Sequence, residues 1–307
     1  MAFSAQDVKN LREMTGVGMM DCKKALTEAD GDIDKAIEWL REKGLAAAQK
    51  KAGRIAAEGV AYADVFDGVG VVVEVNAETD FVAKNELFIE FTKNVALVVA
   101  KENPADIAAL FACKYPGTEL TVEQMQQEKV LVIGENIKIR RFARYDAGLS
   151  IPYVHMGGRI GVIINLDAPA DIMDRGEVVE LGKDLAMQIA AMNPSYRDKS
   201  DVDQSVLDKE KEILMIQAKE DPKNASKPDA IIEKMVMGRV GKFFEENCLL
   251  QQAYVKGDKI SVEQHIAEVS KSVGGKIGVN GFTRFEKGEG IEKKQDDFAA
   301  EIASLVK

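Results

Sequence analysis

The sequence predicts an α+β fold: an N-terminal three-helix module, a duplicated core of antiparallel sheets and helices, a protruding helical hairpin and a C-terminal helix. Helical periodicity fills the first fifty or so residues, two similar strand–strand–helix units follow, and a charged pair of helices interrupts the second unit. We therefore predict a helical module at 1–54, core subdomains at 55–143 and at 144–199 with 245–286, a hairpin at 200–244 and a C-terminal module at 287–307.

Three short helices are expected in the N-terminal module. Ser4 and Asp7 have the spacing of a capping box, which marks the start of the first helix. Asp32 is the expected N-cap of the third helix, and Gly44 is a candidate for its end. The basic, alanine-rich stretch 45–54 then predicts a connecting helix that leads into the core.

The second helix of the module begins with two adjacent methionines. Met19 and Met20 follow a Gly-Val-Gly turn at 16–18. Two neighbouring side chains on a short helix cannot both point into a small core, so we expect at least one to contact a partner. The alternative is that both are packing residues.

An internal repeat predicts the architecture of the core. Strand-like runs at 60–66 and 69–76 are joined by Asp67-Gly68, which is a strong hairpin signal. Residues 70–77 are then matched by 161–168, and continuing that register sets Phe81 opposite Ile172. Because one such unit cannot bury its sheet face alone, the repeat predicts a duplicated core.

The helices after each repeat strand carry an apolar face. The first face is expected to comprise Leu87, Phe88, Phe91, Val95 and Val98. Thr121 and Gln124 form a second capping box, and another strand begins near Ile137. Both features complete the first core subdomain.

The hairpin and the C-terminal helix are predicted from charge and spacing. Residues 200–219 are charged and helical, and Asp229 is the expected cap of a second helix with Ile232, Met235, Val236, Val240 and Phe243 on one face. Asp296 or Asp297 is expected to cap a last helix with Phe298, Ile302 and Leu305 on its apolar side.

The composition excludes several classes of protein. The 307-residue chain has a net charge of −10 and no basic run longer than a pair, which argues against nucleic acid as a direct partner. Three scattered cysteines and two histidines support neither a disulfide framework nor a zinc site. No apolar run approaches the roughly 18 residues of a membrane span, and the N-terminus does not read as a secretory signal. We expect a reduced cytoplasmic protein without a metal or cofactor.

Motifs for catalysis are absent from the sequence. There is no phosphate-binding loop, dinucleotide fingerprint, serine elbow or zinc-protease motif. A binding protein is therefore favoured over an enzyme. His155 reads as a structural histidine, and Phe81 has two interpretations: a hydrophobic staple on the following helix, which the residues alone favour, or an aromatic anchor for a partner protein.

Five blocks of sequence then indicate a family. Residues 15–26 read Thr-Gly-Val-Gly-Met-Met-Asp-Cys-Lys-Lys-Ala-Leu, which resembles the N-terminal signature of the elongation factor Ts family, the guanine-nucleotide exchange factors of EF-Tu. Similar matches to the family follow in its own order, at 74–83, 133–137, 158–162 and 281–293. The hairpin at 200–244 is similar to the coiled-coil protrusion of the family.

The resemblance implies a fold and an activity. It implies that 1–54 resembles a ubiquitin-associated domain and that the chain binds EF-Tu·GDP and promotes exchange of GDP for GTP without making bonds. A scaffold or chaperone-like partner of EF-Tu without exchange activity is the alternative. Exposed hairpins of this kind can pair, so both self-association and a monomer are open.

The resemblance also implies which residues touch EF-Tu. By this resemblance, Phe81 is inserted into EF-Tu beside its magnesium and phosphate site, which contradicts the staple interpretation. Its neighbours in the interface are Asp80, Val82, Ile133, Gly134 and His155. The edge of the EF-Tu nucleotide pocket is expected to contact Met19, Met20 and Lys23, with further contacts from Tyr254 and Val255. Ala253 stands where family members commonly have proline, so the path of that loop is open.

Overall fold

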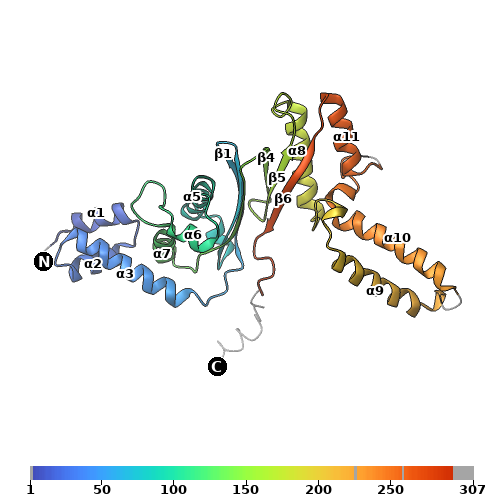
Figure 1. Cartoon of the computed structure of the whole chain (residues 1–307). Coiled ribbons are helices and arrows are strands. Elements are labelled where there is room, and N and C mark those ends of the chain that lie inside the picture. The colour runs from blue at the N-terminus through green and yellow to red at the C-terminus, as the bar shows by residue number, and fades with distance from the viewer. Residues whose placement is uncertain (1–2, 225–226, 258, 293–307) are drawn as a thin grey trace.

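The part of the chain that the structure describes folds into four parts, which lie one after another along an elongated molecule (Figure 1). A computed structural model describes residues 3–224, 227–257 and 259–292. An N-terminal helical module lies at one end, two sheet-and-helix units form the centre, and a helical hairpin projects from the second unit (Figure 1). The predicted α+β class is confirmed. The predicted helix after Asp296 or Asp297 lies outside the described residues.

The N-terminal module consists of α1 (Ala5–Thr15), α2 (Met19–Glu28) and α3 (Ile33–Lys51). The capping box at Ser4 and the cap at Asp32 are confirmed. The predicted end at Gly44 is wrong, because α3 continues through it into the connecting segment. Gly44 is buried where α3 packs against α7 (Val122–Ile133), and a Cβ atom there would lie at an ordinary contact distance of 3.4 Å from the carbonyl oxygen of Gln127.

Two three-stranded antiparallel sheets form the core. The first has the order β1 (Glu58–Phe66), β2 (Val69–Ala77), β3 (Lys138–Tyr145), and the second β4 (Leu149–His155), β5 (Ile160–Asp167), β6 (Gly278–Glu286). The repeated strands β2 and β5 are the central strands of their sheets. The helices α5 (Glu86–Glu102) and α8 (Gly176–Met192) cover the outer faces, and the two sheets face each other (Figure 1). The predicted duplication is confirmed.

Small residues bring the two sheets close together. A Cβ atom at Gly70 would lie 2.4 Å from Cβ of Ser150, and one at Gly161 would lie 2.8 Å from the carbonyl oxygen of Ala61. A side chain at either glycine would force the sheets apart. The space between them is filled by a small cluster of buried residues: Ala61, Ala63, Val72, Ile163 and Phe285.

The two halves match in polar detail as well. Glu74 and Asn165 are buried at the same position of the repeat, and each lies at a β-bulge. Glu74 accepts hydrogen bonds from Arg140 Nη1 at 3.0 Å and from the backbone N–H of Gly288 at 2.8 Å. Asn165 Oδ1 accepts one from Asn280 Nδ2 at 2.8 Å. The buried carboxylate thus fastens the segment after β6 to the first sheet.

Further helices complete each unit. The first contains α4 (Asp80–Ala83), α6 (Ile107–Ala112) and α7, and the second contains α11 (Val262–Val273) in the place of α7. The predicted capping box at Thr121 is confirmed, and Ser261 forms the equivalent box at the start of α11. Among the described residues, 3₁₀ turns lie at η1 (Lys199–Asp201), η2 (Pro222–Asn224) and η3 (Leu249–Gln251).

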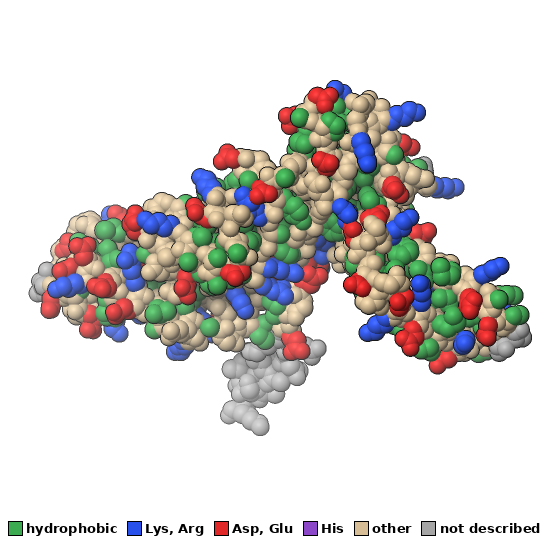
Figure 2. Space-filling view, in the orientation of Figure 1, with side chains coloured by type: hydrophobic (Ala, Val, Ile, Leu, Met, Phe, Trp, Pro, Cys, Tyr) green, Lys and Arg blue, Asp and Glu red, His purple; other side chains and the backbone are tan. Residues whose placement is uncertain are grey.

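The predicted hairpin is confirmed as α9 (Gln204–Glu220) and α10 (Asp229–Asn247). Its two helices pack around a small core of their own, formed by Ala218, Ile232, Val236 and Val240. The predicted cap at Asp229 is wrong: Pro228 occupies the N-cap position without a side-chain hydrogen bond, and Asp229 begins the first turn. Apolar and charged side chains lie side by side on the hairpin surface (Figure 2).

Candidate partner-binding site

The turn after β2 presents an aromatic side chain to solvent. Phe81 lies in the short helix α4 and is 81% exposed, the largest exposed fraction among the large hydrophobic side chains of the described residues. Its neighbours Val82 and Ala83 are buried in the first core cluster. Burial of Val82 fixes the turn, and Phe81 therefore points outward. The staple interpretation of Phe81 is wrong.

The hydrogen bonds of the turn correct the register of the repeat. The N–H of Asn85 donates to the carbonyl of Val82 at 2.9 Å, and in the second unit the N–H of Arg175 donates to Ile172 at 3.0 Å. Ile172 is thus equivalent to the buried Val82, and the predicted equivalence with Phe81 is wrong. The shift arises because the first turn has one extra residue, Glu78, between strand and helix.

Two carboxylates tie this turn to the end of α7. Glu135 Oε2 accepts hydrogen bonds from the backbone N–H groups of Glu78 at 3.1 Å and Thr79 at 3.0 Å. Glu135 Oε1 accepts the hydroxyl of Thr79 at 2.7 Å. In return, Glu78 Oε1 accepts the N–H of Asn136 at 2.6 Å and contacts the guanidinium of Arg54. Hydrogen bonds from both sides therefore join the two loops.

Asp80, beside Phe81, is exposed and ionised. The ammonium group of Lys84 donates a hydrogen bond to Asp80 Oδ2 at 2.7 Å. This hydrogen bond and the positive charge of Lys84 lower the pKa of Asp80, and the nearby charge of Lys287 acts in the same direction. The turn therefore offers a negative charge next to an apolar ring.

Ile133 and Gly134 lie at the end of α7, next to the carboxylate tie. Gly134 is the exposed C-cap residue, with a φ of 88° that favours glycine. Ile133 is half-buried against the first core cluster. The structure thus brings Asp80, Phe81, Ile133 and Gly134 into one neighbourhood, and Glu135 holds its two loops together.

His155 ends β4 at the turn between β4 and β5. Its Nδ1 lies 2.9 Å from the hydroxyl of Tyr153, and the two rings are stacked, so the histidine is half-buried and hydrogen-bonded. Next to it, Met156 is well exposed. The carbonyl of Arg159 in this turn accepts the N–H of Lys287 at 2.9 Å, which connects the turn to the lysine near Asp80.

The predicted contacts of the N-terminal module are all exposed. Met19 and Met20 are 53% and 77% exposed at the start of α2, and Lys23 lies on the exposed side of the same helix. Met14, at the end of α1, is also largely exposed. Sequence reasoning missed Met14, although it precedes the same glycine turn.

Tyr254 and Val255 differ from one another. Tyr254 is buried, stacks on His265 with ring centroids 4.1 Å apart, and donates its hydroxyl to Asp184 at 2.6 Å. Burial and the hydrogen bond to Asp184 raise its pKa. Val255 is exposed beside it. Tyr254 therefore holds the loop, and the structure places this loop beside α8 and α11, at the opposite side of the molecule from α2 (Figure 1).

Comparison with known proteins points to one family. A family model described as Elongation factor TS matches residues 78–289, which is more than half of the chain. An elongation factor Ts of Syntrophotalea carbinolica is 47% identical over 309 residues, covering 100% of both chains. The chain belongs to the elongation factor Ts family. Relatives of the same name from Clostridium perfringens (50% identical, 99% of both chains) and Clostridium botulinum (47% identical, 98% of this chain and 97% of the relative) extend the match.

The matched range contains the aromatic turn of this elongation factor Ts family member. It begins at Glu78, the extra residue of the turn, and ends at Glu289, close to the Gly288 that Glu74 binds. As a member of the family, the chain is a translation elongation factor. The N-terminal module lies outside that range but within the full-length matches.

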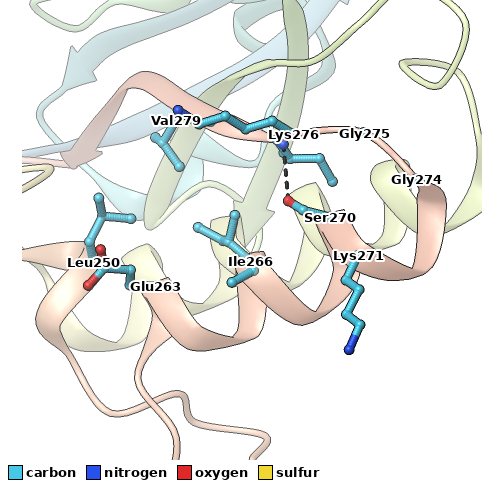
Figure 3. A pocket seen from close by; sticks show the side chains of 12 residues that line it. Leu250, Glu263, Ile266, Ser270, Lys271, Gly274, Gly275, Lys276 and Val279 are labelled. Atoms are coloured by element: carbon cyan, nitrogen blue, oxygen red, sulfur yellow. Dashed lines mark hydrogen bonds between the residues drawn. The ribbon is translucent and has the colours of Figure 1, made fainter.

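The chain also has an apolar pocket of about 690 Å³ between α11 and β6. Leu250, Ile266 and Val279 line it, and the N–H of Ile277 donates to Ser270 Oγ at its edge (Figure 3). None of the predicted contact residues lines this pocket. Within residues 3–224, 227–257 and 259–292, no cluster of three or more histidine, cysteine or acidic side chains could hold a metal ion. Across the same residues, none of the helices combines the length and the hydrophobicity that a transmembrane span requires.

Leu87 was predicted to lie on the buried face of α5, but it is exposed at the first turn of that helix. The prediction is wrong because α5 begins at Glu86 and its apolar face starts at Phe88.

Two residues that contribute to the site, Glu78 and Glu135, were not predicted from the sequence pattern. Glu78 and Glu135 carry no motif of their own. The signal that the sequence offers is their place inside two of the blocks that resemble the family, at 74–83 and 133–137.

Proposed function

We propose that this chain binds EF-Tu·GDP in the cytoplasm and promotes release of GDP and its exchange for GTP by inserting Phe81 beside the magnesium and phosphate site. The observation that carries this proposal is the outward-pointing, 81% exposed ring of Phe81 on a turn fixed from two sides. Exposing a phenylalanine so fully in water has no stabilising role in the free chain. Rigid aromatic side chains of this kind dominate binding energies at protein interfaces.

Exchange by this route requires binding alone. A factor that binds nucleotide-free EF-Tu more tightly than the nucleotide-bound form must weaken nucleotide affinity by the same factor, by thermodynamic linkage. Much of the grip of a GTPase on its nucleotide comes from the phosphate loop and Mg²⁺, so displacement of the groups around the metal loosens the nucleotide. The chain therefore acts as an exchange factor and not as an enzyme that makes bonds.

The contact residues divide into three surfaces in this proposal. The first comprises Phe81 with Asp80, Ile133, Gly134 and, at its side, His155; the second comprises Met19, Met20 and Lys23; the third is Val255. Val82 and Tyr254 are buried and support the first and third surfaces from below. Because the three surfaces are spread along the molecule, EF-Tu meets a long face of the chain.

A scaffold without exchange activity is the alternative function. The two functions are separated by release of a fluorescent GDP analogue from EF-Tu, measured with and without the chain. We expect catalytic amounts of the chain to accelerate release. Binding to EF-Tu without acceleration would instead support the scaffold. Direct binding of nucleic acid is not expected, because acidic and basic side chains are mixed over the face shown in Figure 2.

The hairpin is expected to contribute little to exchange. Its helices have a separate small core, and at its base the N–H groups of Ser195 and Tyr196 donate to the carbonyl of Asn247, the last residue of α10, which lies outside the replaced range. Replacing 203–243 by a short Gly/Ser linker should therefore leave a folded chain with at least part of its exchange activity. Gel filtration of the same variant tests self-association through the hairpin. A folded variant with no exchange would contradict this prediction.

A further inference from the structure

The carboxylate tie between Glu135 and the aromatic turn exists in only one half of the duplicated core. In the second unit the residue equivalent to Glu135 is Gly275, which follows the C-cap Gly274 as Glu135 follows Gly134. A Cβ atom at Gly275 would lie 2.6 Å from Cδ1 of Ile172. The second unit therefore fills this place with a buried side chain and has no room for a carboxylate.

The donors that Glu135 binds are also missing from the second unit. The residue equivalent to Thr79 is Pro169: Ala83 N–H donates to the carbonyl of Thr79, and Met173 N–H donates to that of Pro169. Proline has neither a backbone N–H nor a hydroxyl. Glu78, whose N–H and carboxylate complete the tie, is the residue that the second turn lacks. The fold therefore closes its second half without any of these groups.

The tie coincides with the turn that presents Phe81. Glu135 satisfies two backbone N–H groups and a hydroxyl on the two residues that precede Asp80, at 2.7–3.1 Å. Charge-assisted hydrogen bonds of this kind are stronger and more directional than neutral ones. They set the angle at which the chain leaves β2, and hence the direction of the ring two residues later.

We infer that Glu135 is a positioning residue, which holds the Phe81 turn in the orientation that engages the partner. This inference rests on the proposed function of Phe81. Glu135 acts through the backbone of Glu78 and Thr79 and need not touch the partner. Glu78 has the reciprocal role, since its carboxylate holds Asn136 in the loop that carries Glu135.

The test is a double-mutant cycle in the full chain, with stimulated GDP release as the readout and thermal melting as a control. Glu135→Ala should lower stimulated release roughly tenfold or more, as expected for a misplaced contact group. Glu135→Gln should retain most of the activity, because its amide oxygen can accept the two N–H groups and its NH₂ can donate to the hydroxyl of Thr79.

The decisive variant is Glu135→Ala combined with Phe81→Ala. If Glu135 acts through Phe81, its removal should have little further effect on release once the ring is absent. An undiminished further loss would overturn the inference, because Glu135 would then be a contact or a general stabiliser. Normal release by Glu135→Ala alone would also overturn it. Normal release by Phe81→Ala alone would instead contradict the proposed function, so the two failures are distinguishable.

Glu78→Ala provides a second route to the same answer if Glu135→Ala does not fold. It loosens the same two loops from the other side and removes one carboxylate acceptor, while Glu135 keeps its own hydrogen bonds in the turn. The reduction in stimulated GDP release caused by Glu78→Ala should likewise be smaller when Phe81 has already been replaced by alanine. An equal loss in both backgrounds would count against the inference.

Discussion

Phe81→Ala should abolish most of the exchange activity and leave the stability of the free chain nearly unchanged. The ring is 81% exposed, and surface substitutions usually change the free energy of unfolding by less than about 0.5 kcal/mol. Truncation of an aromatic anchor at an interface costs on the order of 2–4 kcal/mol. That corresponds to a loss of about 30- to 1000-fold in the binding constant. Thermal melting and GDP release from EF-Tu measure the two effects separately.

Matched controls for this variant lie in the same turn and in its counterpart. Ile172 is 2% exposed, and Ile172→Ala should cost about 2–5 kcal/mol of folding stability with release largely intact at low temperature. Val82→Ala should also lower the melting temperature, but less, because two methyl groups are removed where isoleucine loses three carbons. If Phe81→Ala lost as much stability as Val82→Ala and exchanged normally, Phe81 would be a packing residue and the proposed function would be wrong.

Removal of residues 1–54 should also reduce GDP release strongly while the core still unfolds cooperatively. The module carries Met19, Met20 and Lys23 and has its own apolar core. The truncation should also lower the stability of the core. Leu131 and Val132 of α7 pack against the apolar core of the module, so the truncated chain should melt at a lower temperature. Melting followed by circular dichroism and release of the fluorescent GDP analogue test both parts.

A point variant separates the contact from the packing. Met19→Ala with Met20→Ala in the full chain removes two exposed side chains and leaves α3 on α7. We expect an unchanged melting temperature and a loss of release of about 5- to 30-fold, equivalent to roughly 1–2 kcal/mol of binding. Unchanged release in both the truncated and the point variant would show that the N-terminal module does not contact EF-Tu.

Short-range features of the fold were predictable from the sequence alone. The structure confirms the capping boxes at Ser4 and Thr121 and the hairpin at Asp67-Gly68. These features were predictable because each depends on residues only a few positions apart. The repeat of β2 in β5 was predictable too, since duplicated strands keep the same alternation of side chains. These features determine the fold class and the duplication of the core.

Contacts between distant segments required the tertiary structure. Gly44 resembles a helix end in sequence, yet it lies inside α3, where this helix packs against α7. The sequence repeat set Phe81 opposite a core isoleucine, and only the hydrogen bonds of the turn show that Glu78 shifts the register by one residue.

The orientation of the candidate contact residue was decided in the same way. Phe81 sits within a sequence pattern that favours a buried staple, and its exposure follows from the burial of Val82 and the tie to Glu135. That tie joins residues 57 positions apart for Glu78 and 56 for Thr79. The sequence therefore indicated the family, most of the helices and strands, and the candidate contact segments. The direction of the ring was decided by the tertiary structure, because it depends on hydrogen bonds that form only when β2 and α7 are packed together.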